Sequence, residues 1–190
     1  MSSPGSAIDN HFIAKWHPKY DCTEDDQQEY ERLIAKVRSE LAQFGSFEKA
    51  TFIDILNWKA ARVKGKIDWA NITVYLDRIR KCGNLAEPER LKKLVELQGI
   101  GVPVASTILH FMYPDNFPIM DIRTVEVLHK YGYIQRRSRD LKRFPRFQDA
   151  ILSIQRAYPK WDLRQIDRAI FAFHKNHPRL FMVISPTRGA

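Results

Sequence analysis

Apolar residues recur at spacings of three and four along most of the chain, and turn residues separate the periodic stretches. The first stretch begins at Thr23, which with Asp26 resembles a helix-capping signal, and it ends at Gly45. Its apolar side chains fall on one helical face: Tyr30, Leu33, Ile34, Val37, Leu41 and Phe44. This spacing predicts an amphipathic helix.

Similar spacing continues through the rest of the chain. Ser46 is expected to cap a helix that reaches Trp58, and Asp68 to cap a helix that stops near Gly83. Further helices are predicted over residues 87–97, 121–131, 147–158 and 162–175. There is no series of alternating strand residues, and only residues 180–184 are expected to be extended. The pattern therefore predicts an all-α fold.

A tight turn between two apolar helices is expected within residues 88–112. Leu94 and Leu97 close the first helix on its apolar face, and Gly99-Ile100-Gly101 permits a sharp reversal of the backbone. Amides at the start of the second helix point outward, where the helix dipole favours a phosphate. This helix-hairpin-helix pattern predicts DNA contacts, and a plain joint between two helices is the alternative. The expected contact residues are Gly99, Ile100, Gly101, Val102 and Val104.

The distribution of charge favours the same partner. Lys and Arg number 31 against 22 Asp and Glu, for a formal net charge of +9. Residues 135–146 are strongly basic, and we expect Arg136, Arg137 and Arg139 to contact phosphates. A second basic group holds Lys59, Arg62, Lys64 and Lys66. Double-stranded DNA is therefore the expected partner, with a merely solvated basic face as the alternative.

Length and composition narrow the class of protein. At 190 residues and 44% hydrophobic, the chain can bury a core of its own. Cys22 and Cys82 are too few for a disulfide framework, a four-cysteine zinc site or a cysteine-bound iron–sulfur cluster, so free thiols are expected. No apolar run reaches the ~18 residues of a membrane span, and residues 1–10 lack the apolar stretch of a secretory signal. We expect a monomer that needs no cofactor and no catalytic metal. Its expected location is the cytoplasm, at the nucleoid, or the nucleus if the source is eukaryotic.

Two segments carry a family resemblance: Leu97–Ser106 (LQGIGVPVAS) and Phe117–Asp121 (FPIMD). They resemble the signature of the helix-hairpin-helix DNA glycosylase superfamily, which includes endonuclease III and the adenine-mismatch glycosylases. The resemblance covers about residues 91–130. With Asn57–Arg62 (NWKAAR) and Leu163–Phe171 (LRQIDRAIF), these segments are most similar to one bacterial branch of that superfamily.

The resemblance implies two helical lobes with a cleft between them. The hairpin lobe is expected over about residues 46–118, and the other lobe over about residues 23–45 plus 119–178. The expected organisation is then an arm at 1–22, a single two-lobed domain at 23–178 and a tail at 179–190.

The resemblance also implies a catalytic role for Asp121, which follows the hairpin at the start of a predicted helix. A carboxylate there can stabilise the cationic sugar that develops as a base departs, and it can orient or deprotonate the attacking water. A helix N-terminus favours the ionised form. Because aspartate is also a favoured helix cap, a purely structural role is the alternative.

Bifunctional members of the superfamily carry a lysine four residues after the first hairpin glycine, where this chain has Pro103. Proline has no amine to form a Schiff base, so the resemblance implies hydrolysis without strand cleavage from this position. A lysine from elsewhere, such as Lys64 or Lys130, is the alternative. The superfamily also allows a monovalent ion held by carbonyl groups at Leu97 or Gly99.

Two further groups of residues are candidates for contact with DNA. Lys64 and Lys66 stand where related enzymes have a loop that probes the minor groove, and a solvated turn is the alternative. Trp58, Lys59 and Arg62 are candidates for a base pocket, in which a ring stacks and charged groups read base edges. A core position for Trp58 is the alternative.

Two functions follow from these patterns. The first is a monofunctional DNA N-glycosylase of base excision repair, which flips a damaged or mismatched base and hydrolyses its N-glycosidic bond with Asp121. The second is a non-catalytic helix-hairpin-helix domain that binds DNA or senses damage. Asp121 favours the first and Pro103 the second.

Overall fold

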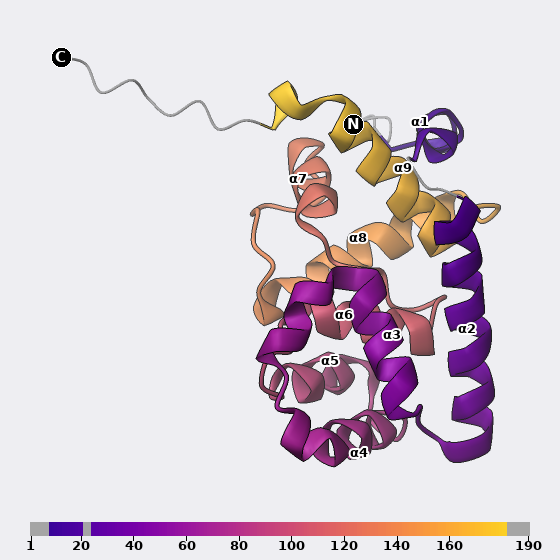
Figure 1. Cartoon of the computed structure of the whole chain (residues 1–190). Coiled ribbons are helices and arrows are strands. Elements are labelled where there is room, and N and C mark those ends of the chain that lie inside the picture. Colours follow the sequence, from indigo (N-terminus) through magenta and orange to yellow (C-terminus); the bar gives the residue numbers. More distant parts are fainter. Residues whose placement is uncertain (1–7, 21–23, 182–190) are drawn as a thin grey trace.

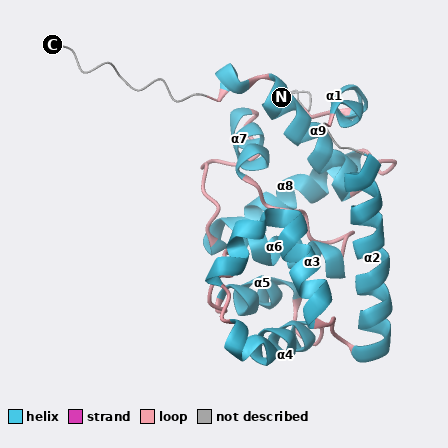
Figure 2. Cartoon of the chain, in the orientation of Figure 1, coloured by secondary structure: helices cyan, strands magenta, loops and turns pink. Residues whose placement is uncertain are grey.

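The computed structural model describes residues 8–20 and 24–181 (Figure 1). All regular secondary structure in these ranges is helical, and no strand occurs within them (Figure 2). The α-helices are α1 (Asn10–Trp16), α2 (Glu24–Phe44), α3 (Lys49–Ala60), α4 (Ile72–Cys82), α5 (Glu87–Val95), α6 (Val102–Met112), α7 (Ile122–Lys130), α8 (Phe144–Ala157) and α9 (Leu163–Asn176). The 3-10 helices are η1 (His17–Lys19), η2 (Ala61–Lys66), η3 (Trp69–Asn71), η4 (Leu141–Arg143) and η5 (Pro178–Leu180). The expected all-α fold is confirmed.

Helix α6 is the centre of the first group of helices, and it packs against α2, α3 and α5. Every residue of α6 except Pro103 is buried. Because a helix that is apolar on all sides needs partners on all sides, α2 is drawn into this group, where it runs beside α3 (Figure 1). This differs from the prediction that residues 23–45 belong to the other lobe. Near its start, α2 also touches α9, where Gln27 accepts a hydrogen bond from Arg168.

Helix α9 is the centre of the second group, and it packs against α1, α7 and α8. The arm expected at residues 1–22 is corrected here, because residues 10–16 form α1, capped by the Asp9 carboxylate, which accepts the N–H of Phe12 at 2.7 Å. Phe12 and Trp16 are buried against the ring of Phe173 on α9. The helix was missed because seven residues hold too few turns for a periodic signal.

The start of the expected tail also packs on this group. Leu180 ends the 3-10 helix η5, so the extended segment expected from this residue does not begin there, and residues 182–184 lie outside the described ranges. The next side chain, Phe181, is buried and stacks on His174 with ring centroids 4.3 Å apart. The folded domain therefore extends past residue 178.

The helix caps predicted at Ser46 and Asp68 are wrong. Asp162, for which no cap was predicted, starts α9 with a capping box, in which its carboxylate accepts the N–H of Gln165 at 2.6 Å. Ser46 caps nothing, because its hydroxyl donates to the carbonyl of Leu76 at 3.1 Å and α3 begins only at Lys49. Asp68 precedes the 3-10 helix η3 rather than α4 and makes no side-chain bond to a helix N–H. These two side chains found other partners in the folded chain.

The turn between α5 and α6 is held tightly against η2. Gly99 has a φ of +79°, and a Cβ atom at this position would lie 2.5 Å from the carbonyl oxygen of Lys66. The next contact comes from Tyr75, whose hydroxyl donates to the carbonyl of Gln98 at 2.8 Å and accepts the N–H of Asp68 at 3.2 Å. The expected pair of helices around a glycine turn is present, and the turn has a fixed position relative to α3 and α4.

His110 of α6 is a buried, neutral histidine. Its Nδ1 lies 2.9 Å from the carbonyl oxygen of Phe117, and its Nε2 lies 2.8 Å from the hydroxyl of Tyr30. A carbonyl only accepts, so Nδ1 carries the proton and Nε2 accepts from Tyr30. Burial lowers the pKa of His110 to about 4.

Stability is therefore expected to fall with acidification through this histidine. The pKa of His110 is about 4 in the folded protein and 6.5 in the unfolded chain, so the unfolded chain binds a proton more readily between these values. The neutral histidine therefore contributes fully to the free energy of unfolding above pH 6.5, and this contribution is lost as the pH falls toward 4. The loss is at most about 3 kcal/mol over this interval. Urea unfolding at several pH values measures it. His110→Gln should flatten the slope in this interval and the exposed His11→Gln should not; equal slopes in all three proteins would contradict the assignment.

Candidate functional site

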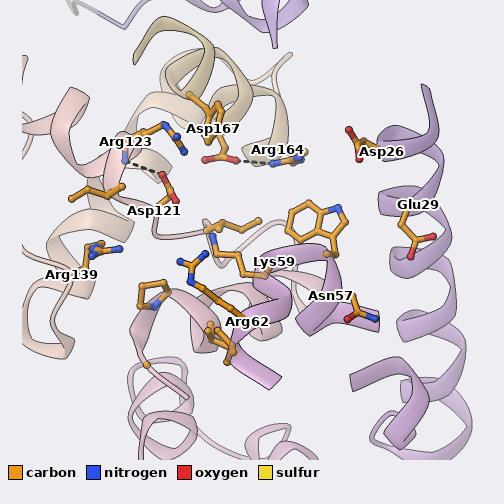
Figure 3. A pocket seen from close by; sticks show the side chains of 18 of the residues that line it. Asp26, Glu29, Asn57, Lys59, Arg62, Asp121, Arg123, Arg139, Arg164 and Asp167 are labelled. Carbon is orange, nitrogen blue, oxygen red and sulfur yellow. Dashed lines mark hydrogen bonds and ion pairs between the residues drawn. The ribbon is translucent and has the colours of Figure 1, made fainter. Parts of the chain in front are cut away.

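A cleft of about 940 Å³ opens where the two groups of helices meet (Figure 3). Its walls come from α2, α3, η2, the hairpin turn, the start of α7 and α9. Charged side chains of both signs line it: Asp26, Glu29, Lys59, Arg62, Lys66, Asp121, Arg123, Arg139, Arg164 and Asp167. The cleft therefore brings together side chains that are up to 141 positions apart in the sequence, which no local pattern could have linked.

Asp121 both caps α7 and lines this cleft. Its carboxylate accepts the backbone N–H of Arg123 at 2.8 Å and is partly exposed. A carboxylate has four lone-pair directions, and this bond uses one of them. The two expectations for Asp121, a helix cap and a cleft carboxylate, are thus compatible in one side chain.

The loop that leads to Asp121 is anchored on the hairpin helix α6. The hydroxyl of Ser106 accepts the N–H of Met120 at 3.0 Å, and His110 holds the carbonyl of Phe117. Both anchors are buried, as are the loop residues 117–120. The position of Asp121 relative to the hairpin is therefore set by hydrogen bonds to α6 rather than by a mobile connection.

The hairpin turn contributes backbone to the cleft. Gly99 and Gly101 line it, and so does Val104, whereas the side chains of Ile100 and Val102 are buried. The N–H of Val104 already donates to the carbonyl of Gly101 at 3.0 Å. Of the five hairpin residues expected to contact DNA, Gly99, Gly101 and Val104 thus line the cleft, while Ile100 and Val102 anchor the turn from inside.

The three residues expected to form a base pocket all line the cleft. Trp58 has features of both a pocket residue and a core residue. It is partly exposed to the cleft, and its ring packs edge-on against Phe111, with the ring centroids 5.1 Å apart. Arg62 is exposed at the cleft, and Lys59 reaches from α3 toward Asp121 and Asp167 (Figure 3).

Sequence reasoning missed a buried ion pair on α9 that forms the back of the cleft. Arg164 donates to Asp167 at 2.8 Å, and Asp167 also accepts the hydroxyl of Thr124 at 3.1 Å. Burial raises the pKa of the Asp167 carboxyl, and the guanidinium of Arg164 opposes that rise. Arg164 also lies over the rings of Tyr20 and Trp58, with its Cζ atom 5.2 and 5.0 Å from their centroids. Two opposite charges three positions apart on an otherwise apolar helix face were the available signal.

Lys59 is the lysine most strongly affected by the cleft. Burial lowers the pKa of its amine, the charges of Arg164 and Arg139 lower it further, and the carboxylates of Asp121 and Asp167 oppose that change. No hydrogen bond or ion pair ties the amine to another described residue. The cleft thus holds a half-buried amine that points toward two carboxylates and pairs with neither (Figure 3).

The basic residues expected to bind phosphates lie in two places. Lys66 and Arg139 line the main cleft, and Arg136 lines a second hollow of about 340 Å³. Lys64 and Arg137 line neither of these hollows. The segment over residues 135–146 therefore contributes to both hollows, with Arg139 in the main cleft and Arg136 in the second one.

Neither metal ligation nor membrane insertion is indicated by the part of the chain that the structure describes. Within residues 8–20 and 24–181, no three His, Cys, Asp or Glu side chains gather as a metal site would require. None of the helices in these ranges is long and apolar enough to cross a membrane. Cys82 is a buried free thiol. Cys22 and residues 182–190 lie outside the described residues. The monovalent ion at Leu97 or Gly99 stays a prediction.

No protein-family model, curated protein or solved structure matches this chain. The interpretation of the cleft therefore depends on its own residues and their geometry.

Proposed function

We propose that this protein is a DNA N-glycosylase that extrudes one nucleotide from duplex DNA into the main cleft and hydrolyses its N-glycosidic bond. The observation that supports this most directly is the convergence of the hairpin glycines and Asp121 on a single cleft. A backbone turn suited to phosphate and a carboxylate suited to a cationic sugar then lie within reach of one nucleotide.

The side chains around the cleft suit the phosphates, the base and the sugar of such a nucleotide. Lys66, Arg62 and Arg139 line the cleft and would hold the phosphates. Trp58 lines the cleft, and an extruded base would stack on its ring beside the Arg164 guanidinium. Asp121 would face the anomeric carbon, stabilise positive charge there and take up a proton from the attacking water. Pro103 supplies no amine, so base removal is proposed to proceed by hydrolysis.

The second candidate is a DNA-binding or damage-sensing domain without catalysis. The hydrogen bond from the N–H of Arg123 to Asp121 favours this non-catalytic domain. An aspartate at the start of α7 is already explained by its role as a helix cap, so it does not require a catalytic role.

Incubation with a panel of duplexes distinguishes the two candidates. The panel contains oxidised, alkylated, deaminated and mismatched bases, and abasic sites are revealed by alkali after the incubation. We expect an alkali-dependent cut at one class of base. Binding to the duplexes without a cut at any base would favour the sensing domain, and a lack of binding would contradict both.

A further inference from the structure

Lys59 projects from α3 into the cleft, toward the carboxylates of Asp121 on α7 and Asp167 on α9 (Figure 3). Its neighbour in sequence, Trp58, is the ring proposed to stack on the extruded base. A nucleotide in the cleft would therefore have the Asp121 carboxylate near its sugar and the Lys59 amine near the bond that joins sugar and base.

Cleavage of that bond leaves an electron pair on the nitrogen of the departing base. A neutral base leaves as an anion unless a proton is delivered as the bond breaks. Arginines along the cleft do not release protons, because a guanidinium stays protonated in proteins. Asp167 is already engaged by Arg164 on one carboxylate oxygen and by Thr124 on the other. Lys66 is exposed at the surface of the cleft. Lys59 is half-buried, and its amine has no hydrogen bond to another described residue, so it is better placed than these groups to give a proton.

We propose that Lys59 is the proton donor to the departing base, a role that rests on the function proposed above. The C1′–N bond breaks, its electron pair goes to the base nitrogen, and that nitrogen receives a proton from the Lys59 ammonium. Water forms the new C1′–O bond and gives its proton to Asp121. The proton on Asp121 then returns to the Lys59 amine across the cleft, so both groups regain their starting state and no other reactant is needed.

The environment of Lys59 is suited to proton transfer. An amine in water holds its proton too tightly to be an efficient acid near neutral pH. Here burial lowers the pKa of Lys59, and Arg164 and Arg139 act in the same direction. Asp121 and Asp167 oppose them, which keeps a protonated fraction available. Besides these four side chains, Arg62 of η2 and Arg123 of α7 also line the cleft around the amine (Figure 3).

The test compares variants at Lys59 on two leaving bases of one class. The base that the wild-type protein removes is compared with a better leaving base, 5-fluorouracil for a pyrimidine or the cationic N7-methylguanine for a purine. Lys59→Met should slow excision of the first base by at least ~100-fold, and excision of the better leaving base by less than ~10-fold. Lys59→Arg keeps the charge but cannot release a proton, so it should be as slow as Lys59→Met. Lys49→Met, at the exposed start of the same helix, is the matched control.

The pH dependence gives a second measurement. Because the donor must be protonated, the wild-type single-turnover rate should fall on the alkaline side, and this fall should be absent in Lys59→Met. Equal slowing of both bases, recovery of the rate in Lys59→Arg, or a wild-type protein that removes only the better leaving base would each overturn the role of Lys59. Absence of excision of any base by the wild-type protein would instead contradict the proposed function itself. Thermal melting shows that each variant is folded.

Discussion

Asp121→Asn is expected to lower the single-turnover rate of base removal by at least ~100-fold while leaving the fold and DNA binding intact. Asparagine is as good a helix cap as aspartate, so its side-chain oxygen can still accept the N–H of Arg123. It carries no charge to stabilise the sugar cation and cannot take a proton from water. The variant thus separates the two roles that Asp121 combines.

Three measurements complete this experiment. Excision is timed with enzyme in excess over the duplex, binding is followed by fluorescence anisotropy, and stability by urea unfolding. The control is Asp149→Asn, an exposed position on α8, which should match the wild type in all three. If Asp121→Asn retains the wild-type rate, Asp121 is only a cap and the chemistry lies elsewhere.

Gly99→Ala is expected to destabilise the protein by about 3 kcal/mol, because two costs add at one position. The φ of +79° lies in the left-handed region, where a Cβ atom costs ~1–2 kcal/mol. The new Cβ would also lie 2.5 Å from the carbonyl oxygen of Lys66, and this neighbour is backbone that cannot rotate away. Melting temperature should fall by roughly 6–12 °C for a domain of this size.

Gly101→Ala provides a control two residues away in the same turn. The φ of Gly101 is −84°, and a Cβ atom there would meet only the Pro103 ring, at 3.8 Å. The melting temperature of Gly101→Ala should change by less than a third of the change expected for Gly99→Ala. Similar melting temperatures for the two variants would show that the contact with Lys66 relaxes easily, and the turn would then be less fixed than the geometry indicates.

Part of the candidate site was predictable because its residues belong to local patterns. Gly99 and Gly101 stand in a turn between two periodic stretches, and Asp121 opens a third such stretch. Trp58 and Lys59 end α3 and Arg62 lies in η2 directly after it, so one correct placement of this segment brings all three to the cleft. The other part was not predictable, because Arg164 and Asp167 reach the cleft only through the packing of α9 on α7.

The sequence by itself determined the helices other than the seven-residue α1, since the spacing of apolar residues is a local property that each longer segment carries wherever it packs. It also determined the glycine turn and the absence of an amine at Pro103. Only the tertiary structure showed that α2 packs with the group of helices around α6 and that α1 packs against α9. It alone also showed that Lys59 points toward two carboxylates without forming an ion pair. These outcomes depend on burial and on the fields of distant charges, which arise only when segments far apart in the chain come together.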